Sequence, residues 1–199
     1  MSIFENFKKN SLGGNYKLPP KFCYTLFLLF FFSFLLNAQP DRADRPVDFP
    51  TPPLTDNSLF FIQRNLNKNT IVYDAKLDEE GNYHSSKPID AYWRRYASTG
   101  ERKELKWVDK TFAYGYSSKK RNGKILVELV AYDERYISLE KTPEGKPVAT
   151  IMCNGKKCKL DYIYVFADES GMWPSVIHVD IHATDLLTGK KEKERILND

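Results

Sequence analysis

Near its C-terminal end, the sequence holds one group of residues with the chemistry of metal ligands. His178, Asp180 and His182 alternate with apolar residues, so a β-strand would place all three on one face. Two histidines at positions i and i+2 of a strand can chelate one ion, and a carboxylate can complete the ligand set, with His84 as a distant candidate. The group is a candidate metal site, and zinc is the cofactor that such ligands would bind. The simpler alternative is an exposed polar face that needs no cofactor.

A second candidate site is rich in tyrosine and arginine. On a strand, Tyr92, Arg94 and Tyr96 would share one face, and Trp93 and Arg95 the other. Arginine binds carboxylates and phosphates through its planar fork, and tyrosine stacks while it hydrogen-bonds. The two tyrosines and two arginines are therefore candidate ligand-binding residues for a sugar, peptide or anion. The structural alternative is that the rings pack in the core and the arginines form cation–π contacts or salt bridges.

Two cysteines flank a predicted hairpin. Cys153 and Cys158 are separated by four residues. Directly opposed positions on antiparallel strands bring Cα atoms to about 4.5–5.5 Å, which a disulfide can span. We predict this disulfide, with free thiols as the alternative, because a two-residue Asn-Gly turn would instead set the cysteines on a diagonal at about 7–8 Å. The spacing differs from the C-x2-C of zinc knuckles and redox dithiols.

The sequence lacks the local motifs of common enzymes. It has no G-x-S-x-G nucleophile elbow, no phosphate-binding P-loop and no H-E-x-x-H, and it has only three histidines. We therefore expect a non-catalytic binding or cell-envelope-associated module whose partner is a small ligand or an envelope component. The alternative is a metal-dependent or hydrolytic enzyme that uses the face formed by His178, Asp180 and His182.

The first 38 residues have the pattern of a secretory signal peptide. Lysines precede a nearly continuous apolar block at residues 22–36, which is followed by Asn37 and Ala38. The block is shorter than the ~20 residues that span a bilayer, and no cluster of basic residues follows it. We expect cleavage after Ala38, a periplasmic or extracellular location, and membrane contact only before cleavage. An uncleaved anchor is the alternative.

The charge balance argues against a nucleic-acid partner. The chain has 30 basic and 26 acidic residues, and removal of residues 1–38 leaves 26 basic against 25 acidic. Nucleic-acid affinity rests chiefly on neutralised phosphates, for which a near-neutral domain is poorly suited. Residues 39–57, with five prolines, are predicted to be an extended linker with little to bury. Residues 58–199 have the length of one domain.

The remaining pattern is that of a mainly β domain. Short segments with apolar and polar residues in alternation recur about every 10 residues, separated by turn residues. We expect strands at residues 59–62, 71–77, 89–97, 125–132, 136–139, 148–153, 158–167 and 176–187. Such an antiparallel meander is typical of a small barrel or a sandwich.

One short α-helix is expected near residues 102–113. Leu105, Val108 and Phe112 recur at helical spacing between charged residues, and Gly115 follows the predicted end. We expect these three apolar side chains to pack the helix onto the sheet.

An aromatic strand, a glycine turn and a helix ending in Ala-Tyr-Gly follow one another in this region. The residues that carry the pattern are Tyr92, Trp93, Tyr96, Gly100, Leu105, Ala113, Tyr114 and Gly115. In this pattern the sequence resembles the exported bacterial family DUF4833, a domain of unknown function, from about residue 58 to near the C-terminus. The resemblance implies an exported domain and transfers no catalytic residue, ligand or cofactor.

Overall fold

The computed structural model describes residues 44–168, 170–171 and 174–198. The predicted signal peptide, residues 1–38, lies outside the described residues, as does the start of the predicted linker. Within the described ranges, no helix is both long and apolar enough to cross a bilayer. Residues 45–198 belong to one compact unit.

Eleven strands and one helical segment make up this unit. The strands are β1 (Ser58–Arg64), β2 (Asn67–Ala75), β3 (Ile89–Arg94), β4 (Arg102–Glu104), β5 (Tyr116–Arg121), β6 (Lys124–Leu129), β7 (Tyr132–Lys141), β8 (Pro147–Cys153), β9 (Lys156–Asp168), β10 (Ser175–Asp185) and β11 (Lys191–Leu197). The helical segment lies between β4 and β5 and consists of α2 (Trp107–Asp109) followed by the π-helix η1 (Lys110–Tyr114).

All eleven strands belong to one sheet, and β9 is the strand that joins its parts. β10 pairs antiparallel with β9 along one edge and with β11 on its other side. On the opposite edge of β9, its first residues pair antiparallel with β8 and residues 162–165 pair parallel with β1. From there the sheet continues through β2, β3 and β4 on one side and through β7, β6 and β5 on the other.

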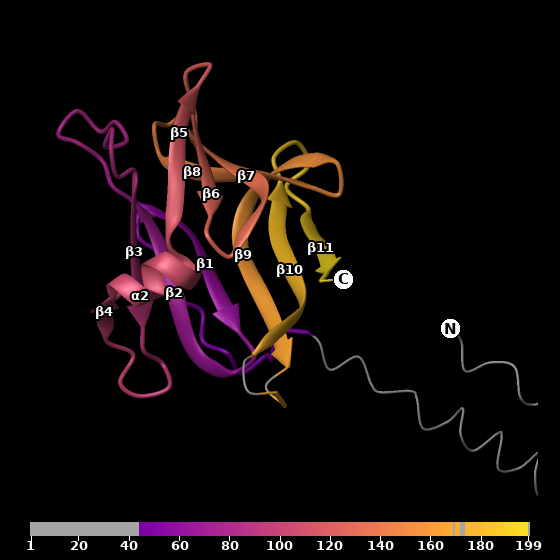
Figure 1. The fold of residues 1–199 in the computed structure, drawn as a ribbon. Helices are drawn as coiled ribbons and strands as arrows, with labels where there is room; N and C mark the ends of the chain where they lie inside the picture. Colours follow the sequence, from indigo (N-terminus) through magenta and orange to yellow (C-terminus); the bar gives the residue numbers. More distant parts are fainter. Residues whose placement is uncertain (1–43, 169, 172–173, 199) are drawn as a thin grey trace, which may run out of the picture. The chain divides into compact units, whose positions relative to one another are not determined.

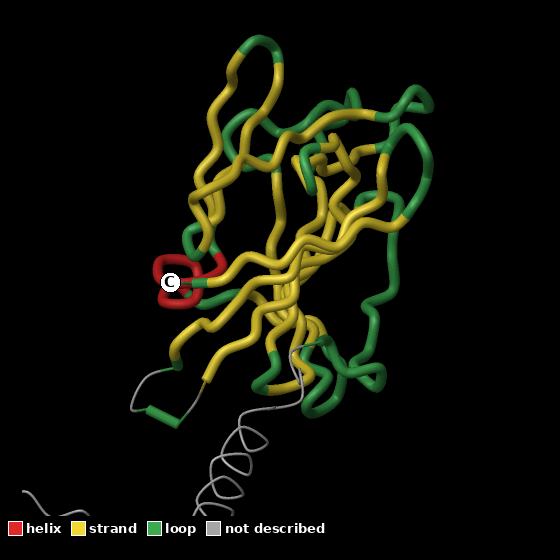
Figure 2. The backbone as a smooth tube through the Cα atoms, turned by 90° about the vertical axis from the view of Figure 1, so that its right-hand side faces the viewer, coloured by secondary structure: helices red, strands yellow, loops and turns green. Residues whose placement is uncertain are grey.

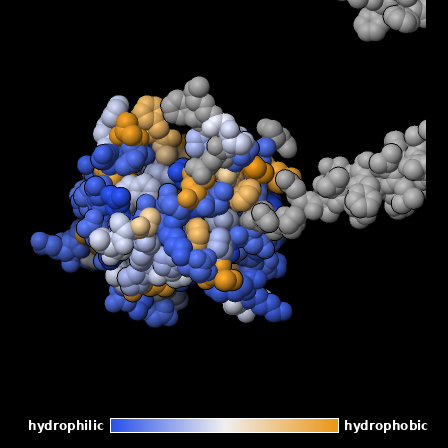
Figure 3. All heavy atoms as spheres, turned by 90° about the horizontal axis from the view of Figure 1, so that it is seen from below, coloured by the Kyte–Doolittle hydropathy of each residue, from blue (hydrophilic) through white to orange (hydrophobic). Residues whose placement is uncertain are grey.

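The sheet curls into a half-barrel, and Figures 1 and 2 show its strands turning around a common interior. Alternate residues of the strands point inward and form one buried apolar cluster that includes Ile71, Tyr73, Val127, Leu160 and Ile181. Outside, the face shown in Figure 3 is largely hydrophilic, with hydrophobic side chains in separate patches. Burial of the inward residues is therefore the main apolar contribution to stability.

The structure confirms the mainly β prediction and refines its topology. The domain is neither a closed barrel nor a two-sheet sandwich, because one sheet curls only part of the way round. The β1–β9 pair is parallel, and a meander contains no such pair. The sequence analysis also missed β11, whose charged residues alternate with too few apolar ones to give a strand pattern.

Two Asn-Gly dipeptides form the hairpin turns. Asn122 and Gly123 connect β5 to β6, and Asn154 and Gly155 connect β8 to β9. All four residues have positive φ angles between 49° and 76°. Two such residues in succession give the type I′ turn, whose twist matches that of the flanking strands.

The predicted disulfide is absent, and Cys153 and Cys158 are buried free thiols. Because the turn has only two residues, Cys153 lies opposite Lys156, and Cys158 lies opposite Ile151. The two thiols are thus diagonal neighbours in the apolar cluster, at a separation that disfavours a disulfide. Burial raises the pKa of the Cys153 thiol to about 11, so this cysteine is a poor nucleophile at neutral pH.

The predicted helix begins later and packs differently than expected. Residues 102–104 form β4, and the helical segment starts only at Trp107. Leu105 is buried as predicted, but Val108 and Phe112 are 52% and 70% exposed. The prediction of core packing was wrong for these two residues, because the α-helix spans only three residues before it widens into a π-helix, in which the i, i+3, i+7 face is not maintained.

Tyrosine hydroxyls join parts of the curled sheet that are not paired strands. The Tyr116 hydroxyl on β5 donates to the Ile89 carbonyl on β3 over 2.7 Å and accepts from the Ile89 N–H over 3.1 Å. Similarly, Tyr73 donates to the Tyr114 carbonyl, and Tyr83 donates to the Glu140 carbonyl, both over 2.9 Å. The Tyr116 contacts hold β3 and β5 together where the curl brings them close, and we call this junction the seam.

Replacement of Tyr116 by phenylalanine should destabilise the seam. The variant loses two hydrogen bonds and leaves the Ile89 backbone without these partners, so we expect the free energy of unfolding to fall by about 1–2 kcal/mol. Urea denaturation measures the change. Tyr136→Phe is the matched control, because its hydroxyl accepts only from exposed Lys119; equal losses in the two variants would contradict the proposed role of the seam.

Alkylation should distinguish the two buried thiols from a disulfide. Without reductant, Cys153 and Cys158 should react slowly with iodoacetamide in the folded protein and fast in denaturant, because burial both shields them and disfavours the thiolate. Peptide mapping by mass spectrometry assigns the label to each cysteine. Resistance in denaturant until a reductant is added would show that the disulfide does form.

Candidate functional site

One opening beside the sheet lies where β1 and β8 separate. Both strands occupy the same edge of β9, β8 as far as Lys159 and β1 from Tyr162 onward. Between these points the edge of β9 has no neighbouring strand, and a pocket of about 620 Å³ opens there. We call it the fork pocket. A break in a sheet is a favourable place for a ligand, because the strands around it are held rigidly by the rest of the fold.

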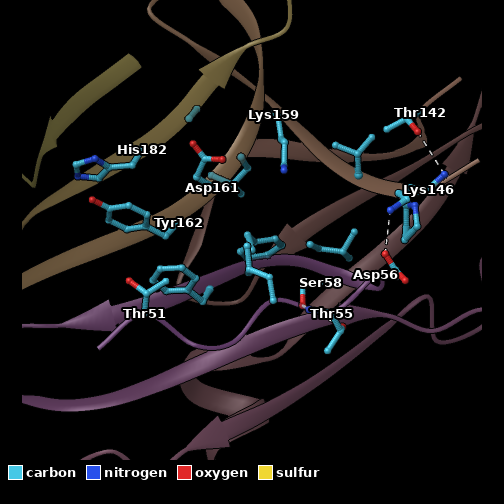
Figure 4. A pocket seen from close by; sticks show the side chains of 18 of the residues that line it. Thr51, Thr55, Asp56, Ser58, Thr142, Lys146, Lys159, Asp161, Tyr162 and His182 are labelled. Atoms are coloured by element: carbon cyan, nitrogen blue, oxygen red, sulfur yellow. Dashed lines mark hydrogen bonds and ion pairs between the residues drawn. The ribbon is translucent and has the colours of Figure 1, made fainter. Parts of the chain in front are cut away.

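Apolar side chains form much of the lining of the fork pocket, and polar groups stand along its walls. Figure 4 shows Lys159 and Asp161 projecting from β9, His182 beside Tyr162 at one end, and Lys146 with Asp56 at the other. The apolar lining comes from five segments, the stretch before β1 and strands β1, β8, β9 and β10, and includes Leu54, Phe60, Phe61, Val148, Leu160 and Ala183. The pocket therefore offers an apolar interior with a few polar groups at defined positions.

Most charges around the fork pocket are already paired. Lys146 contacts Asp56 over 3.0 Å, and Lys191 contacts Asp161 over 2.8 Å. Asp161 also accepts a hydrogen bond of 2.7 Å from the Thr184 hydroxyl. The Lys159 ammonium, in contrast, forms no hydrogen bond or ion pair with any described residue. It is the positive charge of the pocket that remains available to a ligand.

The structure divides the predicted metal-binding residues between different environments. His182 lines the fork pocket and stacks on Tyr162 with ring centroids 4.1 Å apart. His178 is buried and stacks on Phe166, and Asp180 is fully buried. Among the described residues, no group of three or more His, Cys, Asp or Glu side chains is arranged to hold a metal ion. Only His182 of the three faces the pocket.

The Asp180 carboxylate is held by two cations from β11. Arg195 donates to both carboxylate oxygens over 2.7 and 2.9 Å, and the Lys193 ammonium lies 3.1 Å away. Burial alone would raise the pKa of Asp180, but these hydrogen bonds outweigh it and hold the pKa below its usual value. The carboxylate is thus ionised at neutral pH and anchors β11 to β10.

The segment at residues 45–51 packs against side chains of β1 and β9. Arg45 donates to the Gln63 side-chain carbonyl, its guanidinium lies over the Tyr162 ring, and Phe49 meets Tyr164 edge-on. Gln63 in turn donates to the Pro50 carbonyl over 2.7 Å. The sequence analysis predicted an extended linker here with little to bury. The described part turns at residues 46–49 and again at residues 55–58. It also packs on the sheet, because Arg45 and Phe49 find polar and aromatic partners.

Replacement of Asp180 by asparagine should remove a pH-dependent part of the stability. Because the folded pKa is lowered, the stabilisation is complete at neutral pH and is lost as pH falls through the folded pKa. At pH 7 we expect a loss of about 2 kcal/mol, because the hydrogen bonds of two partly exposed cations lose their charged acceptor. Denaturant titrations from pH 7 to 3 should show the difference from wild type shrinking. Exposed Glu80→Gln is the control, and a difference that stays constant with pH would contradict this account.

The predicted ligand-binding residues around Tyr92 form a packed polar cluster. Tyr92 is buried and donates to Asp74 over 2.8 Å, while the Arg102 guanidinium stacks on its ring at 3.8 Å. Burial, reinforced by Asp74, raises the pKa of Tyr92 to about 12. Arg94 lies 5.8 Å from the same ring. These contacts match the structural alternative of cation–π packing, and Arg95 and Tyr96 belong to the turn after β3.

Apart from His182, the residues that line the fork pocket were missed from the sequence. Lys159 and Asp161 lie in a segment correctly predicted as a strand, where they read as ordinary outward-facing polar residues. No local signal identifies them, because the pocket exists only where β1 and β8 meet the same edge of β9. The position of the pocket follows from the parallel pairing of β1 with β9, which a single sequence does not reveal.

Fold and pockets define this protein as a single-sheet β half-barrel with a ligand-sized opening. Over residues 60–195 the sequence matches the family described as "Domain of unknown function (DUF4833)". The match covers more than half of the chain, and the protein belongs to this family. Neither the curated proteins nor the solved structures contain a match to the chain.

Proposed function

We propose that the protein is an exported, non-catalytic binding module that holds a small amphipathic anion in the fork pocket. The ligand would have an apolar body and one acidic group. The observation that carries the proposal is the unpaired Lys159 ammonium on the wall of a mostly apolar pocket.

The size and lining of the fork pocket support a small-molecule ligand. A volume of about 620 Å³ lies within the range of pockets that bury drug-sized molecules. Leu54, Phe61 and Val148 supply apolar contact area, and Phe61 and Val148 come from strands fixed by the sheet. A preformed site of this kind binds without a large ordering cost.

The charges around the fork pocket favour one acidic group on the ligand. Lys146 and Lys191 each have an acidic partner, so Lys159 supplies the only uncompensated charge among the described lining lysines. A hydrogen bond to a charged partner contributes roughly 1.5–3 kcal/mol, enough to orient a ligand whose body is held by apolar contact.

The polar groups of the fork pocket support binding more than catalysis. Asp161 already accepts from Lys191 and Thr184, and His182 lies flat against Tyr162. The hydrolytic alternative would need a base directed at a nucleophile or at water, and these contacts give it no support. Export to the periplasm or the exterior rests on the signal-peptide pattern of residues 1–38.

The proposal is tested with 1-anilinonaphthalene-8-sulfonate, a fluorescent probe with an apolar body and one sulfonate. We expect saturable binding at one site of the folded protein. Lys159→Ala should weaken it about tenfold, because the sulfonate loses its charged partner. Leu54→Ala should weaken it less, since Leu54 is an exposed part of the lining whose loss leaves the core intact.

Lys120→Ala is the matched control, because Lys120 is an exposed lysine of β5 outside the pocket. Probe binding that is unsaturable, or that Lys159→Ala and Lys120→Ala alter equally, would overturn the proposed function. Thermal unfolding of each variant shows that the fold is retained.

A further inference from the structure

A second pocket, of about 640 Å³, lies at the seam between β3 and β5. We call it the seam pocket. Its walls come from the residue after β2, the segment before β3, the start of β3, the π-helix η1 and the start of β5. It shares no lining residue with the fork pocket, so any ligand here is independent of the proposed function.

Lysines from three separate segments line the seam pocket. Lys76 follows β2, Lys87 precedes β3, and Lys110 begins η1. None of the three ammonium groups forms an ion pair or a hydrogen bond with a described residue. The one carboxylate in the lining, Asp90, is bound to Arg102 over 2.7 Å. The pocket therefore has an uncompensated positive charge.

The backbone around these lysines is fixed by close packing and by hydrogen bonds. At Gly115 a Cβ atom would lie 2.0 Å from the Lys110 carbonyl oxygen, so only glycine allows the chain to leave η1 in this position. The Tyr73 hydroxyl holds the Tyr114 carbonyl, and the Tyr116 hydroxyl holds the Ile89 backbone. Short π-helices occur often at functional sites, and this one fixes Lys110 and Thr111 in the pocket wall.

We propose that the seam pocket binds a phosphate group carried by a small molecule. Like charges held around one cavity repel each other, and a compact dianion between them removes this cost. Lysine ammonium groups bind phosphate as point charges, whereas a planar carboxylate is better matched by the planar guanidinium of arginine. The hydroxyls of Ser86, Thr111 and Ser118 supply further donors. Because the volume exceeds that of phosphate alone, the phosphate carries a further group.

Calorimetric titration tests the proposal with three probes: inorganic phosphate, glycerol 3-phosphate, and vesicles of phosphatidic acid in phosphatidylcholine. We expect saturable binding of glycerol 3-phosphate, tighter than that of inorganic phosphate, and at least a tenfold loss of affinity in Lys87→Gln/Lys110→Gln. Both lysines are exposed and have no side-chain partner, so the variant should fold like wild type. Circular dichroism and thermal unfolding check this.

The matched control is Lys103→Gln/Lys120→Gln, which removes the same charge from two exposed lysines outside the seam pocket. Binding that requires Lys87 and Lys110 but not the control lysines supports the proposal. If vesicles bind with this requirement and the soluble probes do not, the phosphate belongs to a lipid headgroup. Absence of binding to all three probes, or equal losses in both double variants, would overturn it. Lys159→Ala should leave phosphate binding unchanged, which separates this result from the fork pocket.

Discussion

The structure depends on the pairing of β9 with strands on both of its edges. Its antiparallel neighbours β8 and β10 are close in sequence, but β1 lies about one hundred residues away and pairs parallel. The Asn65 side chain extends this pair beyond the end of β1, since its amide donates to the Ala167 carbonyl and accepts from the Ala167 N–H over 2.8 and 2.9 Å. Without the β1–β9 pair the two halves of the sheet would share no edge.

Both pockets are consequences of this one curled sheet. The fork pocket opens because β1 and β8 share an edge of β9 without pairing with each other. The seam pocket opens because the curl brings β3 and β5 together through Tyr116 without pairing them. Each pocket is lined by segments far apart in sequence but fixed by the sheet. The fold therefore provides two rigid openings of opposite character, one mostly apolar and one positively charged.

Local patterns predicted much of the secondary structure, and nonlocal contacts decided the rest. Period-two alternation located most strands, and the Asn-Gly dipeptides located two hairpins, because both signals depend on neighbouring residues. The partners of Asp180 are Arg195 and Lys193 on β11, a strand the sequence did not reveal, so an exposed face was expected where a buried ion cluster exists. Similarly, whether the two cysteines face each other depends on the register of β8 against β9. One residue more or less in the turn would change that register.

The distance in sequence between β1 and β9 also constrains the order of folding. During synthesis in the N-to-C direction, β1 emerges long before the strand that completes its parallel edge. Until then the hairpin of β1 and β2 exposes the edge and the apolar face of Phe60, Ile62 and Ile71. Unpaired edges of this kind attract other chains, and pairing between distant strands is slow. The β1–β2 hairpin therefore keeps an unpaired, association-prone edge until β9 is available to complete it.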